Sequence, residues 1–151
     1  MPRLTLVAGV ATLLVLTTAT SVFGNSHSAA TPAPGSPPAP TAAQISQLKT
    51  LAGQVSASYG ESNPTSGTVV ASMRTAANRL VNGAEISDDA TVYVLDVYGH
   101  FVAMRHPRGV PAPSGTVLTI IVDAATMTPV DTTISKTAPD LSGLGPTQNL
   151  G

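Results

Sequence analysis

Apolar side chains recur every three or four positions in the stretch that leads up to Gly60. Thr41 and Gln44 precede this stretch with the T-x-x-Q spacing of a capping box, in which each side chain bonds the other residue's backbone N–H at the start of a helix. The pattern predicts a helix that begins after Thr41 and stops at Gly60. Its apolar face, which must be buried against another element, consists of Ile45, Leu48, Leu51, Ala52, Val55 and Tyr59.

The next apolar segment, from Thr68 to Val81, allows two interpretations. As a single helix, it would carry on one face Val69, Val70, Met73, Ala76, Ala77 and Leu80. Alternatively, Thr68 to Val70 form a short strand that leads into a helix starting near Met73. We favour the second interpretation. In both, the element ends at Asn82-Gly83, and Ser87-Asp88-Asp89 forms a turn.

Residues 91–98 alternate in the manner of a strand and are rich in β-branched and aromatic side chains. One face would carry Val92, Val94, Asp96 and Tyr98, and the other Tyr93, Leu95 and Val97. Gly99 interrupts the pattern, which resumes over residues 101–104, so we expect a bulge or a tight turn at this glycine.

The remaining segments predict a hairpin and a surface tail. A loop with three prolines and two glycines spans 107–115, and two strands at 116–123 and 129–135 flank a turn at 124–128. The pattern therefore predicts an α+β domain over residues 41–146, with one or two helices packed on a small antiparallel sheet of three or four strands. Residues 139–146 would lie along its surface, and 147–151 would form a flexible tail. We expect its core to include Leu48, Val55, Val94, Leu118 and Ile120.

The first 40 residues have the composition of a targeting segment followed by a tether. Arg3 precedes an apolar run from Leu4 to Leu16, which is shorter than the ~20 residues that a spanning helix needs. Residues 1–24 are therefore either a cleaved signal peptide or an N-terminal membrane anchor, and both export the domain. Residues 25–40 contain five prolines and predict a disordered, extended linker.

Charge and cysteine content narrow the range of functions. The chain has 7 Lys and Arg against 8 Asp and Glu, which lacks the basic excess of a nucleic-acid-binding protein. The same balance disfavours docking on anionic lipid, so any membrane contact would come only from the N-terminal segment, if it remains uncleaved. There is no cysteine, which excludes disulfides, thiolate metal sites and a cysteine nucleophile.

Three stretches between Val92 and Pro146 resemble a known group of proteins: VYVLDVYGHFVA, SGTVLTIIVDAATMTPVDTTIS and PDLSGLGP. They resemble the C-terminal halves of small exported actinobacterial proteins of unknown function, which read VYLVxMxGHF, PTGTVLTxVVDAxTGxVxDxGxS and PDLxxLGPV. The VDAxTGxV element is also similar to the hairpin of PepSY-type domains, exported α+β modules linked to binding or inhibiting proteases. Met127 stands here in place of that hairpin's turn glycine. The resemblance implies an exported domain and names no chemistry.

Two sets of residues could form a metal site or a catalytic site. Asp96, His100 and His106 have side chains that bind metals, but on a straight strand the first two lie about 13 Å apart, too far to share an ion unless the chain bulges at Gly99. Ser114, His100 and Asp123 could form a catalytic triad, but no activated-serine motif accompanies them. We therefore assign no catalytic residue, metal or cofactor. We expect His100 near the surface, with no carboxylate or second histidine within reach.

A cationic cluster is the more promising feature. Arg105, His106 and Arg108 lie at the start of the proline-rich loop, and loops carry binding residues more often than cores do. With His100, they form the predicted contact for an unknown extracytoplasmic protein or ligand. We expect an exported, non-enzymatic binding module at the cell envelope or in the medium. The alternative is a small exported enzyme that uses His100 on an unfamiliar scaffold.

The tether makes a first testable prediction. Because the prolines of residues 25–40 prevent helix and sheet, this segment should be accessible to proteases while the domain resists them. Limited proteolysis of the full chain, followed by mass spectrometry, should yield a stable fragment that begins near residue 41. A stable fragment that retains residues 26–40 would contradict the prediction.

Overall fold

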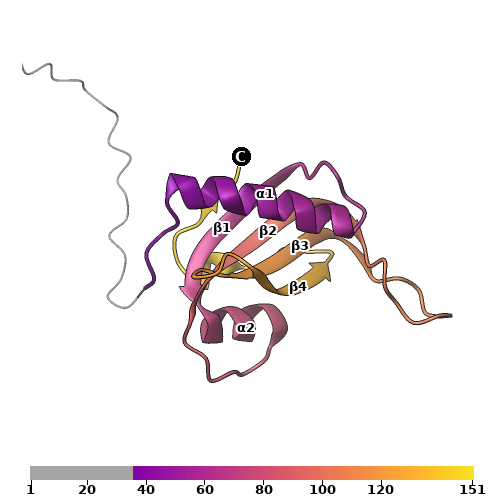
Figure 1. The fold of residues 1–151 in the computed structure, drawn as a ribbon. Helices are drawn as coiled ribbons and strands as arrows, with labels where there is room; N and C mark the ends of the chain where they lie inside the picture. Colours follow the sequence, from indigo (N-terminus) through magenta and orange to yellow (C-terminus); the bar gives the residue numbers. More distant parts are fainter. Residues whose placement is uncertain (1–35) are drawn as a thin grey trace, which may run out of the picture.

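Figure 1 shows the computed structural model, which describes residues 36–151 as one antiparallel sheet with a helix on each face. The strands lie in the order β4-β3-β2-β1-β5. Their bounds are β1 (Ser66–Met73), β2 (Thr91–Val102), β3 (Ser114–Asp123), β4 (Pro129–Ser135) and β5 (Gln148–Asn149). The helices are α1 (Ala42–Ser58), α2 (Arg74–Asn82) and a short 3₁₀ turn, η1 (Leu141–Gly143). The predicted α+β class is confirmed, with five strands where three or four were expected.

The helix α1 forms where its capping box and apolar stripe predicted it. The hydroxyl of Thr41 accepts a hydrogen bond from the backbone N–H of Gln44, and the Gln44 side chain accepts one from the backbone N–H of Thr41. Leu48 is fully buried in a core that includes Leu95 and Leu118, whereas Val55 is only half-buried at its margin. Helix α1 therefore covers the first face of the sheet.

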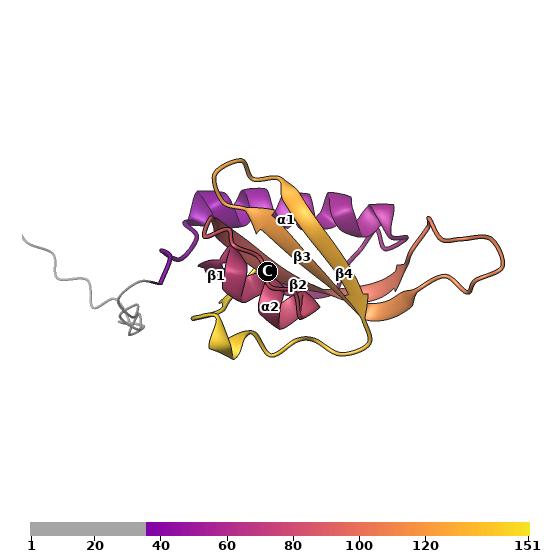
Figure 2. The same cartoon turned by 90° about the horizontal axis from the view of Figure 1, so that it is seen from below.

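The second face is covered differently, by a much shorter helix. The chain leaves β1 at Met73 and enters α2 at once, which confirms the strand-then-helix interpretation. Ala77 of α2 packs against Val70, Val94 and Ile121 in a second buried core. Figure 2 shows α2 against this face with the C-terminal segment running past it.

A β-bulge follows the buried run of β2 from Val92 to Val97. The pairing of β2 with β3 is regular from Val92 to Tyr98, shifts at Gly99, and resumes at Phe101 opposite Gly115. A side chain at Gly99 would begin 2.7 Å from Cγ of Glu61, and one at Gly115 would overlap the carbonyl oxygen of Ser135. Position 115 therefore requires glycine, because the backbone of Ser135 leaves no room for a Cβ atom, whereas a Cβ atom at position 99 would have to displace the Glu61 side chain.

The C-terminal segment belongs to the fold. Leu141 of η1 is buried in the second core, β5 pairs with β1, and Leu150 is buried in the first core. The sequence predicted that the domain ends at residue 146 and that residues 147–151 form a flexible tail, which is wrong. Instead, this stretch is held in place by burial of the Leu150 side chain and by two residue pairs between β5 and β1.

The predicted targeting segment, residues 1–24, and most of the tether lie outside the described residues. Residues 36–40 contain neither helix nor strand, as predicted for the tether, although Pro40 is buried beside the domain. Within residues 36–151, no helix is long and apolar enough to span a bilayer.

Truncation of the α1 stripe tests the packing of the first face. Leu48→Ala should lower the free energy of unfolding by about 2–4 kcal/mol, because it removes a fully buried side chain and leaves a cavity between α1 and the sheet. Gln54→Ala, on the exposed side of the same helix, is the matched control and should change stability little. Urea unfolding of both variants measures the difference, and equal effects would refute the packing.

Candidate functional site

Beyond the bulge, β2 and β3 pair at only two more positions and then lead into a projecting loop; residues 101–114 are here called the arm. Figures 1 and 2 both show it extending past the end of the sheet and away from the helices. The backbone N–H of Ala103 donates to the carbonyl of Pro113 at 2.8 Å and closes the base of its loop. Pro107, Pro111 and Pro113 fix φ within that loop, so its conformational freedom is reduced.

The arm combines exposed apolar and cationic side chains. Among the described residues four large apolar side chains are exposed, and three of them lie here: Val102 (42%), Met104 (68%) and Val110 (52%). Arg105, His106 and Arg108 are exposed between them. No aspartate or glutamate occurs from residue 101 to 114. The arm therefore presents positive charge beside apolar surface.

The base of the arm is held by the connection that follows α1. The backbone N–H of Val102 donates to the carbonyl of Tyr59 at 2.9 Å, and that of His100 donates to Oε2 of Glu61 at 3.0 Å. Hydrogen bonds from the backbone N–H groups of His100 and Asn63 lower the pKa of Glu61, so this carboxyl is ionised. Glu61 therefore anchors the bulge to the rest of the domain.

His100 lies at the surface, as predicted, but the expectation that no carboxylate would be near it was wrong. The bulge turns the backbone N–H of His100 toward Glu61, whose carboxylate accepts a hydrogen bond from it. Among the described residues, no hydrogen bond joins Glu61 to the imidazole of His100. His100 lines a hollow of about 370 Å³ at the base of the arm with Ser114 and Lys136. All four predicted contact residues, His100, Arg105, His106 and Arg108, therefore belong to one β2–β3 hairpin.

Neither catalytic constellation assembles. Ser114 pairs with Val102 at one end of β3, whereas Asp123 pairs with Val92 at the other end, so the proposed triad is spread along the whole strand. Asp96 is buried within the sheet, away from the exposed His100. In the part of the chain that the structure describes, no three His, Asp or Glu side chains could hold a metal ion together.

Asp96 lies in a polar row that crosses the sheet on the α2 face. The register places Thr68 of β1, Asp96 of β2, Thr119 of β3 and Thr133 of β4 side by side. Thr119 Oγ1 donates to Asp96 Oδ1 at 2.6 Å, and the aspartate is only 1% exposed. Burial raises the pKa of Asp96, and the Thr119 hydrogen bond opposes that shift in part.

The C-terminal segment roofs this row and leaves a polar cleft of about 470 Å³. Thr68, Asp96 and Tyr98 form its floor, and residues 139–147 form its roof. Asp140 Oδ1 in the roof accepts a hydrogen bond from the Ser142 backbone N–H at 3.0 Å. Hydrogen bonds from Ser142 lower the pKa of Asp140, so this carboxyl is ionised at neutral pH.

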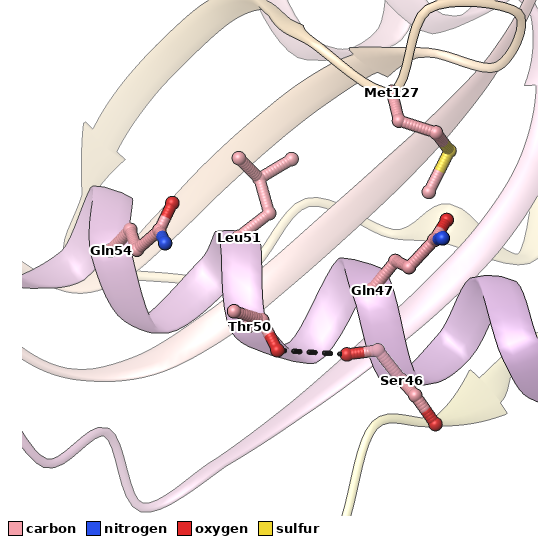
Figure 3. Close-up of a pocket in the computed structure, with 6 residues that line it drawn as sticks. All are labelled: Ser46, Gln47, Thr50, Leu51, Gln54 and Met127. Carbon is pink, nitrogen blue, oxygen red and sulfur yellow. Dashed lines mark hydrogen bonds between the residues drawn. The ribbon is translucent and has the colours of Figure 1, made fainter.

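A larger hollow lies elsewhere but has no ionisable side chain in its lining. This groove has a volume of about 590 Å³ and lies between α1 and the β3–β4 turn. Figure 3 shows the Gln47, Leu51 and Gln54 side chains along the helix and Met127 opposite. Met127 has a φ of 55°, the left-handed conformation that suits the glycine expected at this turn. Its lining contains no ionisable side chain, so volume alone does not identify a site here.

The sequence identified the arm residues but missed the cleft. Asp96 was considered only as a metal ligand with His100, although its position among Val92, Val94 and Val97 in an apolar strand was a signal that it would be buried. The roof over it could not be inferred, because residues 139–147 carry glycines and prolines without a period.

No family model, curated protein or solved structure matches the chain. Its function must therefore be inferred from its own residues.

Replacement of the buried acid gives a prediction with a definite pH dependence. The pKa of Asp96 is raised above its ordinary value of 3.8, so its contribution to stability is fully present below that value and is lost as pH rises through the folded-state pKa. Asp96→Asn keeps an acceptor for Thr119 and removes the titration. Its melting temperature should exceed that of the unmodified chain at pH 8, with a difference that shrinks toward pH 3.

The exposed acid Glu85, mutated to Gln, is the control and should show no comparable gain at pH 8. Melting curves from pH 3 to pH 8 measure the effect. An Asp96→Asn variant that is less stable by the same amount at every pH would show that the carboxylate is not destabilised by burial.

Proposed function

We propose that the chain is an exported, non-enzymatic binding module that acts at the cell envelope or in the medium, with the arm as its contact for a partner protein. Export rests on the apolar segment after Arg3, and the contact rests on the arm. The observation that carries the proposal is the concentration of exposed apolar side chains and arginines on one projecting hairpin without a single carboxylate.

The side chains of the arm are those that protein interfaces use. Arginine offers a planar fork of donors that matches a carboxylate, and methionine adapts its shape to an apolar surface. The three prolines of the loop reduce the entropy that binding must remove. The partner that fits is a protein surface with acidic residues beside an apolar patch, where Met104 and Val110 are covered and Arg105 and Arg108 meet carboxylates.

Charge and composition favour a protein over a membrane or a nucleic acid as the partner. Without Arg3, 6 basic residues remain against 8 acidic ones, so the domain as a whole repels polyanions. The arm has no tryptophan or tyrosine to anchor it at a lipid interface, and its single phenylalanine, Phe101, is buried.

The alternative function, an enzyme that uses His100, has less support. His100 shares its hollow with Ser114 and Lys136, but the carboxylate of Glu61 accepts hydrogen bonds from backbone N–H groups, including that of His100 itself. An imidazole that acts as a general base usually needs a partner that orients its ring. Among the residues that the structure describes, no such partner bonds His100.

Site-specific photo-crosslinking tests the proposal. A photoreactive phenylalanine analogue replaces Met104 on the arm or, as the matched control, Val130, the fourth exposed apolar residue, on β4. Exposed to envelope extract and medium of the producing cells, the Met104 probe should capture one protein through an acidic segment, and the Val130 probe should not. The double variant R105E/R108E should lose about 90% of the adduct or more, as should 0.5 M salt.

Two outcomes would overturn the proposal. Capture that is equal from positions 104 and 130 would mean that the arm is not the contact. An adduct that survives both charge reversal and salt would mean that the arginines do not recognise carboxylates. Melting curves of R105E/R108E exclude unfolding as the cause of lost capture, and because both arginines are exposed, the curves should be unchanged.

A further inference from the structure

We propose that the polar cleft beneath the C-terminal segment is a binding site, separate from the arm, for the protonated amino group of a small organic molecule. The site would hold the ammonium group between Asp96 on its floor and Asp140 in its roof. This inference does not depend on the arm or on its partner.

The first argument is the incomplete bonding of Asp96. Its Oδ1 accepts a hydrogen bond from Thr119, but its Oδ2 accepts none from any residue that the structure describes. The aspartate as a whole is only 1% exposed, yet Oδ2 is not among the fully enclosed side-chain atoms that lack a partner, so this oxygen remains accessible. Because Asp96 lines the cleft, a bound donor in the cleft would complete its bonding.

The second argument is the charge of the cleft. Ten residues line it, two of them are aspartates, and none is lysine, arginine or histidine. Asp140 is held ionised by Ser142, so the roof carries negative charge before any ligand enters. Cations are therefore attracted, and the opposite charge of an ammonium group would favour ionised Asp96 as well. The remaining polar groups, the hydroxyls of Thr68, Tyr98 and Ser142, can all accept a hydrogen bond from its N–H groups.

The third argument is the shape of the site. A volume of about 470 Å³ lies in the range of small-molecule sites. The roof is anchored on one side by Leu141 in the second core and on the other by Leu150 in the first, so the cleft is built into the fold. The half-buried ring of Tyr98 borders the cleft and can contact a cation through its face.

An organic ammonium group suits this set of ligands better than a metal ion. Calcium takes six to eight oxygen ligands, usually with several carboxylates, and magnesium requires near-octahedral geometry. The cleft offers two aspartates, and no third acidic or histidine side chain joins them within residues 36–151. A diamine brings two ammonium groups to a cleft with two aspartates and is therefore a suitable probe.

Titration of the ¹⁵N-labelled full chain at pH 8 with putrescine, followed by NMR, tests the inference. Saturable shifts are expected at the amides of Asp96, Tyr98 and residues 140–142. Asp96→Asn should weaken the apparent Kd about tenfold or more, because it removes a charge-assisted hydrogen bond. Glu85→Gln, the control in an exposed loop, should leave the Kd unchanged. The affinity should fall as pH is lowered through the raised pKa of Asp96, because its carboxylate becomes protonated.

Two further ligands decide whether the ammonium group is what the cleft recognises. 1,4-Butanediol has the length of putrescine without its charge, and calcium chloride supplies charge without the N–H donors. Shifts at the same amides with butanediol alone, or tighter binding of calcium than of putrescine, would overturn the proposal. So would the absence of saturable shifts with putrescine, or equal affinity of the Asp96→Asn variant, whose fold the melting curves verify.

Discussion

Burial of β2 on both faces is the constraint on which the rest of the structure depends. Every residue from Val92 to Val97 is buried, with alternate side chains in the α1 core and in the α2 core. Because this strand has no free face, it fixes the register of β1 and β3 on either side. Both candidate sites depend on it: Asp96 lies within the buried run, and the arm begins where the run ends at the bulge.

The two sites carry opposite charges: the arm belongs to the β2–β3 hairpin, whereas the cleft lies between Asp96 of β2 and Asp140 of the C-terminal segment. The arm offers arginines in water, where an ionic contact is screened and its main effects are orientation and rate of encounter. The cleft offers one carboxylate with little access to water, Asp96, where a single matched charge has a larger effect, and an exposed one, Asp140. A charge change on the arm should therefore be sensitive to salt, whereas the cleft should respond mainly to pH through Asp96.

Local signals in the sequence predicted most of the elements. The capping box at Thr41, the alternation of residues 91–98 and the glycine at position 99 each specify structure through neighbouring residues, so α1, β2 and the bulge could be inferred. The strand β5 could not, because two residues show no period and its partners, Thr68 and Val69, are distant in the chain. For the same reason the arm residues were identified as a cluster, while the cleft, which joins the sheet to residues 139–147, was not.

The strand β5 is synthesised after the other four strands, and this order affects how the domain folds on the ribosome. Until Gln148 pairs with Val69 and Leu150 enters the first core, the outer edge of β1 has unpaired N–H and C=O groups and β4 forms the opposite edge. A chain that has emerged only as far as Ser135 thus has two open sheet edges and an unfilled core, which favours intermolecular strand pairing. Closure by the C-terminal segment is therefore also the step at which a nascent chain becomes safe from aggregation along β1.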